Sequence, residues 1–115
     1  MTEADDIDVR RETFDAGVIL TPIGDVDLSR APALRLHLLD TLRTAPRRLI
    51  VDLREVPYMD SSGVATFIEA MQIARKHDCR LLLCGLQERV RSIFEIARLD
   101  TVFTILDDAE AARSA

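Results

Sequence analysis

Two short, almost uninterrupted apolar runs most restrict what this chain can fold into: RRLIVDL at 47–53 and CRLLLCG at 79–85. A strand in the middle of a parallel sheet is covered on both faces, so its sequence reads as a continuous apolar run. Each run is followed by a segment, 61–77 or 87–99, in which apolar residues recur at helical spacing. Because parallel strands need a long crossover, usually a helix, the pattern predicts βα units with right-handed crossovers.

The segment before the first run is predicted to open with a hairpin. Residues 7–14 and 17–24 are extended candidates joined by a DAG turn. Pro22 lies in the second of them and cannot donate a ladder hydrogen bond, so we expect that strand at a sheet edge or bulged. A helix is predicted to follow, with Ser29 as its N-cap and Pro32 in its first turn.

The predicted fold class is α/β, with a single domain at 7–115 behind a flexible tail at 1–6. A last strand is expected within 101–106 and a final helix within 107–115, which makes the order β-β-α-β-α-β-α-β-α. An opening hairpin followed by βα units predicts a mixed sheet with four helices, mostly on one face.

Composition excludes several classes of function. The formal net charge is -5, whereas nucleic-acid binders normally carry a basic excess. The apolar runs are too short and too often interrupted by charge to span a membrane. The first residues, MTEADDID, lack the apolar core of a secretory signal, so we expect a cytoplasmic protein. Cys79 and Cys84 are expected to be free thiols, with no metal site.

The stretch PYMDSSGV at 57–64 raises the question of function, because it places polar residues between a buried strand and a helix. A helix N-terminus offers unpaired N–H groups and the positive end of the helix dipole. Asp60 or Ser61 could cap the helix and Gly63 could ease the turn. Capping alone stays open as an interpretation, but it leaves the second serine, Ser62, unexplained.

Catalytic interpretations of the two serines are weaker. A serine hydrolase needs a nearby base, and the only histidines are His37 and His77. His77 lies at the far end of the helix that the serines open, about 20 Å away. No phosphate-binding loop motif and no lysine lie near residue 60. The remaining interpretation is a regulatory serine, which phosphorylation would give a charge of about -1.5 to -2.

These residues carry a family resemblance. MDSSGV, preceded by LIVDLREVPY and followed by a helix and LLLCG, resembles the STAS domain family, and more specifically its free-standing bacterial anti-sigma factor antagonists. GDVD at 24–27 resembles the G-E-L-D turn of that family, with Asp25 in place of glutamate. VRSIFEIARLDTVFTI resembles its third helix and last strand, so the resemblance covers residues 8–110.

The resemblance implies a regulatory switch and no cofactor. In this family the unphosphorylated domain binds an anti-sigma factor that is also a serine kinase. The kinase phosphorylates the first serine of D-S-S-G, and a metal-dependent phosphatase reverses the reaction. The matching residue here is Ser61, flanked by Asp60 and Ser62, and Asp27 matches the aspartate of the G-E-L-D turn.

Two further expectations concern the surface around Ser61. If the strands at 17–24 and 47–53 are parallel neighbours, then Asp25, Asp27 and Asp60 form an acidic rim around its hydroxyl. The partner is expected to contact the following helix on residues that fall off its apolar stripe: Ala65, Thr66, Glu69 and Ile73.

The chain is not expected to be an enzyme, because it offers no base, metal set or phosphate loop beside the serines. An alternative interpretation belongs to a different class of protein. Other members of the family that this chain resembles act as scaffolds in signalling assemblies or as cytosolic accessory subunits of lipid ABC transporters, so a structural adaptor that is never phosphorylated stays open as an interpretation.

Overall fold

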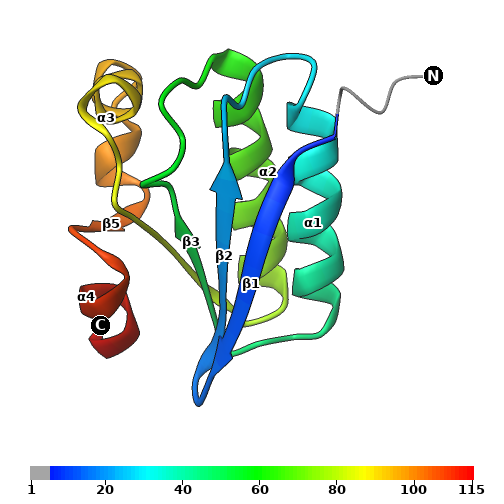
Figure 1. Ribbon diagram of the computed structural model, residues 1–115. Coiled ribbons are helices and arrows are strands. Elements are labelled where there is room, and N and C mark those ends of the chain that lie inside the picture. Colours follow the sequence, from blue (N-terminus) through cyan, green and yellow to red (C-terminus); the bar gives the residue numbers. More distant parts are fainter. Residues whose placement is uncertain (1–5) are drawn as a thin grey trace.

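A mixed five-stranded sheet forms the centre of the computed structural model, which describes residues 6–115 (Figure 1). The spatial order follows the chain: β1 (Asp8–Phe14), β2 (Gly17–Ile23), β3 (Arg48–Asp52), β4 (Arg80–Cys84) and β5 (Thr104–Leu106). The β1–β2 pair is antiparallel and the other three pairs are parallel. The predicted hairpin and parallel βα units are confirmed. Most of the predicted tail, residues 1–5, lies outside the described residues.

The helices cover the two faces of the sheet unequally. The described helices are α1 (Ala31–Arg43), α2 (Ser61–Lys76), α3 (Glu88–Ile96), the short 3₁₀ helix η2 (Leu99–Thr101) and α4 (Ala109–Ser114). The larger core contains buried residues of α1, α2 and α3, whereas α4 covers the smaller core on the opposite face. Figure 1 shows α1 and α2 on one side of the sheet and α4 on the other. The prediction of four helices, mostly on one face, is confirmed.

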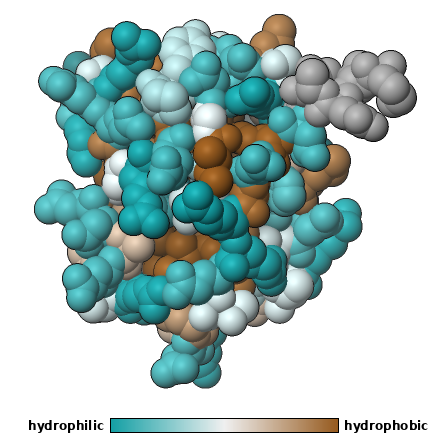
Figure 2. Space-filling model, viewed as in Figure 1, coloured by the Kyte–Doolittle hydropathy of each residue, from teal (hydrophilic) through white to brown (hydrophobic). Residues whose placement is uncertain are grey.

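Burial on both faces explains the continuous apolar runs. In β3, Leu49 and Val51 point into the larger core and Ile50 into the smaller one, and all three are fully buried. Side chains alternate between faces along a strand, so each face takes its share of the run. Full burial of such a side chain is worth roughly 1.5–3 kcal/mol. Figure 2 shows apolar residues in the middle of one view of the surface, ringed by hydrophilic ones.

The expectation that Pro22 marks an edge or bulged strand is wrong. Its strand, β2, lies between β1 and β3, and the register with β1 runs without interruption from Asp8↔Ile23 to Phe14↔Gly17. The sheet tolerates this proline because the ladder between β2 and β3 stops at Leu20↔Val51. Pro22 therefore lies beyond the last residue of β2 that needs a donor toward β3.

No described helix is long and apolar enough to cross a membrane. Cys79 and Cys84 are both free and buried, as predicted. Burial raises the pKa of the Cys84 thiol to about 12, and the Asp52 carboxylate contributes in the same direction. Cys84 is therefore an inert residue of the smaller core, since the thiolate is the reactive form.

This raised pKa predicts a specific loss of stability at alkaline pH. The pKa of the unfolded thiol lies near its ordinary value of 9.0, whereas the pKa of the folded thiol is about 12. Ionisation then favours the unfolded state between these values, with a slope of about 1.4 kcal/mol per pH unit. Urea unfolding at several pH values above 9 is expected to show a steeper loss for the wild type than for Cys84→Ala. If the free energy of unfolding falls with pH equally steeply in both proteins, the raised pKa of Cys84 would be contradicted.

Candidate functional site

Two loops that follow neighbouring strands lie side by side and form the candidate site. Val26, after β2, pairs with Met59, after β3, in an isolated parallel bridge. The Val26 N–H donates to the Tyr58 carbonyl at 2.9 Å, and the Asp60 N–H donates to the Val26 carbonyl at 3.2 Å. The loops thus continue the pairing of their strands, which holds the 24–27 turn against the start of α2. The expected proximity of these segments is confirmed.

Asp60 joins the two loops through its side chain. It is the N-cap of α2, and its Oδ1 accepts a hydrogen bond from the Ser62 N–H at 2.9 Å. Its Oδ2 accepts from the Leu28 N–H at 3.1 Å, across the loop pair. One carboxylate therefore caps the helix and fastens the neighbouring turn. Since Asp60 supplies the cap, the Ser61 side chain is not needed for it.

Asp27 organises the turn that leads into α1. Its Oδ1 accepts from the Ser29 N–H at 3.1 Å, the Ser29 hydroxyl at 2.8 Å and the Arg30 N–H at 3.1 Å. These bonds, the Ser29 hydroxyl above all, hold the pKa of the Asp27 carboxyl below its usual value. The prediction of Ser29 as N-cap is wrong, because α1 begins at Ala31 and Asp27 satisfies the preceding turn.

Only two of the three aspartates of the expected acidic rim take part in the hydrogen bonds of the two loops. The Asp60 carboxylate holds Leu28, the residue after Asp27, so these two aspartates belong to one connected turn. Asp25 lies half-buried in the same loop, and its carboxylate makes no hydrogen bond or ion pair with any described residue. The Asp60 carboxylate thus bonds the turn that Asp27 organises, whereas the Asp25 carboxylate bonds neither segment.

The two serines differ in their surroundings. Ser61 is the first residue of α2 and is exposed. Ser62 is half-buried, with its N–H bound to Asp60 and its carbonyl accepting from the Thr66 hydroxyl at 3.0 Å. Ser61 is therefore the more exposed of the two serines at this helix N-terminus.

Gly63 allows α2 to approach the loop pair closely. A Cβ at this position would lie 2.6 Å from Met59 Cγ, 2.9 Å from Val26 Cγ1 and 3.1 Å from the Val26 carbonyl oxygen. The expectation that this glycine eases a turn is wrong, because Gly63 lies within the helix and is buried. Its role is to leave room for the Val26–Met59 bridge.

The expected partner face on α2 needs correction. Thr66 is 7% exposed, and Ile73 is half-buried against the larger core. Glu69 makes a two-bond ion pair with Arg35 of α1, at 2.8 and 2.7 Å, which lowers the pKa of its carboxyl. The packing of α1 along α2 therefore occupies part of this side of the helix, although the Glu69 side chain stays partly exposed. Of the four, only Ala65 is exposed.

Two exposed apolar residues beside the site escaped the sequence analysis. Leu28 is 74% exposed and Tyr58 is 39% exposed, and each belongs to one of the two paired loops. The signal for Leu28 was present in the sequence, because a leucine inside the polar turn DVDLSR has no role in the helical stripe that follows.

The close approach at Gly63 predicts that replacing this helical glycine by alanine lowers the free energy of unfolding, although such a change usually raises it. In a helix, Gly→Ala ordinarily stabilises by about 1 kcal/mol. Gly63→Ala is instead expected to destabilise by about 1–3 kcal/mol, because the added methyl overpacks the loop contact. Urea unfolding measures the change, and Ala65→Gly, at an exposed position of the same helix, is the matched control, with an expected cost of about 1 kcal/mol. A stabilised Gly63→Ala protein would show that the helix and loops are not in close contact.

Comparison with known proteins agrees with this geometry. The sequence model of the STAS domain family matches residues 6–112. BtrV of Bordetella bronchiseptica, provisionally named an anti-sigma factor antagonist, is 28% identical over 104 residues, which cover 90% of each chain. The anti-sigma-B factor antagonist of Staphylococcus aureus is 28% identical over 87 residues, which cover 76% of this chain and 81% of that protein.

Solved structures show the same fold. An anti-sigma factor antagonist from Mycobacterium paratuberculosis superposes with a TM-score of 0.87 at 20% identity, over 99% of this chain and 97% of that one. The anti-sigma factor antagonist SpoIIAA in its unphosphorylated form superposes with a TM-score of 0.69 at 19% identity, over 90% and 92% of the two chains. The family match extends over nearly all of the described residues, and the chain belongs to the STAS domain family.

Proposed function

We propose that this chain is an anti-sigma factor antagonist that binds a serine-kinase anti-sigma factor while Ser61 is unphosphorylated and releases it when Ser61 carries phosphate. The observation that carries the proposal is that the residue capping α2 and the exposed serine at its start are two different residues. Asp60 caps the helix with Oδ1 and holds the Leu28 N–H with Oδ2, and Ser61 is exposed. The curated relatives named anti-sigma factor antagonists support the same function.

Ser61 is suited to accept a phosphate and not to act as a nucleophile. A serine nucleophile needs a base within hydrogen-bond reach. The Asp60 oxygens are engaged by two backbone N–H groups, and the Asp27 Oδ1 is engaged by its own turn. His77 is the C-cap at the opposite end of α2, where its Nδ1 contacts the Ile73 carbonyl. The proposal therefore includes no catalytic activity of this chain.

A phosphate on Ser61 changes the surface more than the fold. The helix dipole favours a negative group at this end of α2. Against this, two unit charges about 7 Å apart, such as phosphate and the Asp60 carboxylate, repel by roughly 2 kcal/mol at an effective dielectric of 20. Burying a phosphate with nearly two charges against a partner that offers no cation costs several kcal/mol more. The phosphate is thus expected to act on binding before it acts on folding.

The contact surface proposed for the kinase consists of Ser61, Leu28, Tyr58 and Ala65. Leu28 and Tyr58 are exposed apolar residues held on either loop of the bonded pair, and Ala65 lies one turn further along α2. Exposed apolar groups on a rigid support bind without a large cost for ordering. Thr66 is removed from the predicted surface because it is buried. Glu69 lies at the edge of the surface, where it pairs with Arg35 of α1, and Ile73 is half-buried against the larger core.

The proposed cycle needs two partners besides the sigma factor that is freed. The kinase transfers phosphate from ATP to Ser61, and a metal-dependent phosphatase removes it. The proposal places these reactions and this chain in the cytoplasm, and it assigns the chain no metal or cofactor of its own.

Phosphosite mapping tests the assignment of the serine. Incubation with the cognate kinase and ATP is expected to place one phosphate on Ser61 of the wild type and none on Ser61→Ala. Ser62→Ala is the matched control, because it removes a neighbouring hydroxyl and keeps its backbone N–H bond to Asp60. It is expected to be phosphorylated, with a change in stability of less than about 1 kcal/mol, because Asp60 keeps the cap.

Two results would contradict the proposal. Phosphate found on Ser62 of the wild type would move the switch to the other serine. If the chain stays unphosphorylated after incubation with the kinase and ATP, and binds its partner equally well with and without ATP, the adaptor interpretation would be favoured instead.

A further inference from the structure

An apolar hollow of about 310 Å³ lies between the last turns of α1 and α2, two helices that run side by side on one face of the sheet (Figure 1). Leu39 and Leu42 of α1 and Ile73 of α2 make its apolar floor, and the exposed residues Arg43 and His77 line its rim. The hollow thus combines an apolar centre with a polar rim, which is the arrangement found in protein interfaces.

An exposed leucine extends this hollow along α1. Leu36 is 59% exposed and packs against neither of the two cores. It lies one turn before Leu39, and residues three positions apart are neighbours on a helix surface. Leu36, Leu39 and Ile73 therefore form an apolar strip, which leads from the middle of α1 to the hollow.

The strip approaches the surface that we propose for the kinase. Glu69 of α2 pairs with Arg35, the residue before Leu36. Ala65, which belongs to the proposed surface, lies one turn before Glu69 on α2. The Arg35–Glu69 pair thus lies between the proposed surface and the strip. Along α2, the distance from Ser61 to the hollow is roughly 20 Å at 1.5 Å per residue.

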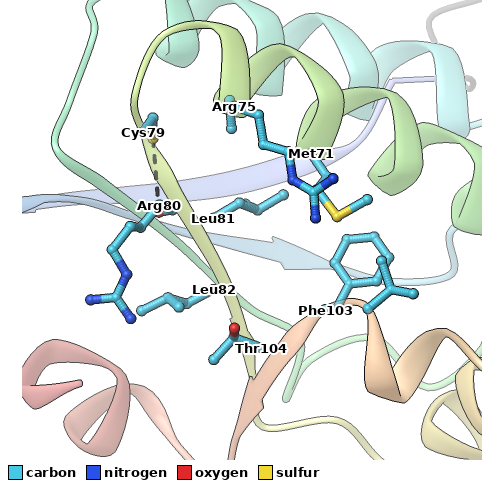
Figure 3. A pocket seen from close by; sticks show the side chains of 10 residues that line it. Met71, Arg75, Cys79, Arg80, Leu81, Leu82, Phe103 and Thr104 are labelled. Carbon is cyan, nitrogen blue, oxygen red and sulfur yellow. Dashed lines mark hydrogen bonds between the residues drawn. The ribbon is translucent and has the colours of Figure 1, made fainter.

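A different cavity, of about 210 Å³, lies on the other side of α2, where this helix meets β4 and the start of β5 (Figure 3). Arg75 and Arg80 are its charged lining residues. Figure 3 shows that they diverge, because Arg80 extends away from Arg75 and Phe103, and its Nη1 donates to the Ala115 carbonyl at 3.2 Å. This cavity lacks converging polar groups, which leaves the hollow between α1 and α2 as the candidate for binding.

We propose that the strip and the hollow bind an amphipathic helix of the serine-kinase anti-sigma factor, as a second contact of the same complex. The inference rests on the proposed function, from which it takes its partner. The stretch from Leu36 to Arg43 spans about 10 Å at 1.5 Å per residue, the length over which a helix in a groove presents apolar residues at i, i+4 and i+7. One of these side chains would fill the hollow, since a cavity of about 150 Å³ already holds a benzene molecule.

The charge at the rim favours an acidic residue beside this apolar anchor. Arg43 and His77 are the titratable residues that line the hollow, and no carboxylate lines it. Arg43 pairs with Asp40 at 3.2 Å, yet its side chain is 77% exposed, and a guanidinium carries five N–H donors. We therefore expect the partner helix to place a carboxylate near Arg43.

The second contact is expected to be independent of the phosphate on Ser61. Substitutions that are more than about 7–10 Å apart and share no partner residue usually have additive effects. The strip therefore raises the affinity of the phosphorylated and the unphosphorylated chain by the same factor, and the phosphate alone sets the ratio between the two forms.

Calorimetry with the cognate anti-sigma factor tests the second contact on the whole chain. Leu36→Asp is expected to weaken binding about tenfold or more, because it places a charge in an apolar contact. Ile96→Asp is the matched control, since Ile96 is 83% exposed on α3, a different helix, and it is expected to leave the affinity unchanged. Urea unfolding of both variants checks that they stay folded. Amide NMR of the complex is expected to show shifts at residues 36–43 and 73–77.

The outcomes separate this inference from the proposed function. If Leu36→Asp binds like the wild type while Leu28→Asp binds more weakly, the second contact is overturned and the proposed function stands. Equal weakening by Leu36→Asp and Ile96→Asp, or the absence of NMR shifts at the strip, would also overturn the second contact alone. If the unphosphorylated wild type does not bind the anti-sigma factor, the proposed function is overturned and the second contact with it.

Discussion

The carboxylate of Asp60 is the contact on which the site depends. One oxygen accepts from Ser62 at the start of α2 and the other accepts from Leu28 in the neighbouring loop. Together with the Val26–Met59 bridge, it fixes the loop after β2 against the helix that follows β3. Gly63 makes this contact sterically possible, because a side chain there would push α2 away from Val26 and Met59. Ser61 is exposed because Asp60 does the capping.

This arrangement separates folding from signalling. The carboxylates of Asp60 and Asp27 accept hydrogen bonds from groups of these loops and hold the surface in shape. A phosphate added to Ser61 meets a favourable helix dipole and a modest repulsion within the domain. Its larger effect falls on a partner that must cover Leu28 and Tyr58, which are exposed beside it.

Most of the fold could be predicted because its signals are local in sequence. The continuous apolar run of β3 and the helical spacing in α2 each report burial of their own segment. Most errors concern segments that only the folded chain brings together, whereas the error at Ser29 is local, because Asp27 lies two residues before it. Thr66 is buried because α1 packs along α2, and Ser29 is not a cap because Asp27 takes the turn. Pro22 is tolerated in an interior strand because the β3 ladder ends before it. The proximity of the two loops was predictable, but the bonds of Asp60 were not.

The most direct test of the central claim is the affinity of the chain for its cognate anti-sigma factor before and after phosphorylation of Ser61. Isothermal titration calorimetry with both forms of the protein supplies it, and urea unfolding of the same samples shows whether the fold is affected. The account predicts that phosphate weakens binding at least a hundredfold, about 3 kcal/mol, while the free energy of unfolding changes by only about 1 kcal/mol. Equal affinities of the two forms, or a phosphorylated chain that loses binding only because it unfolds, would contradict it.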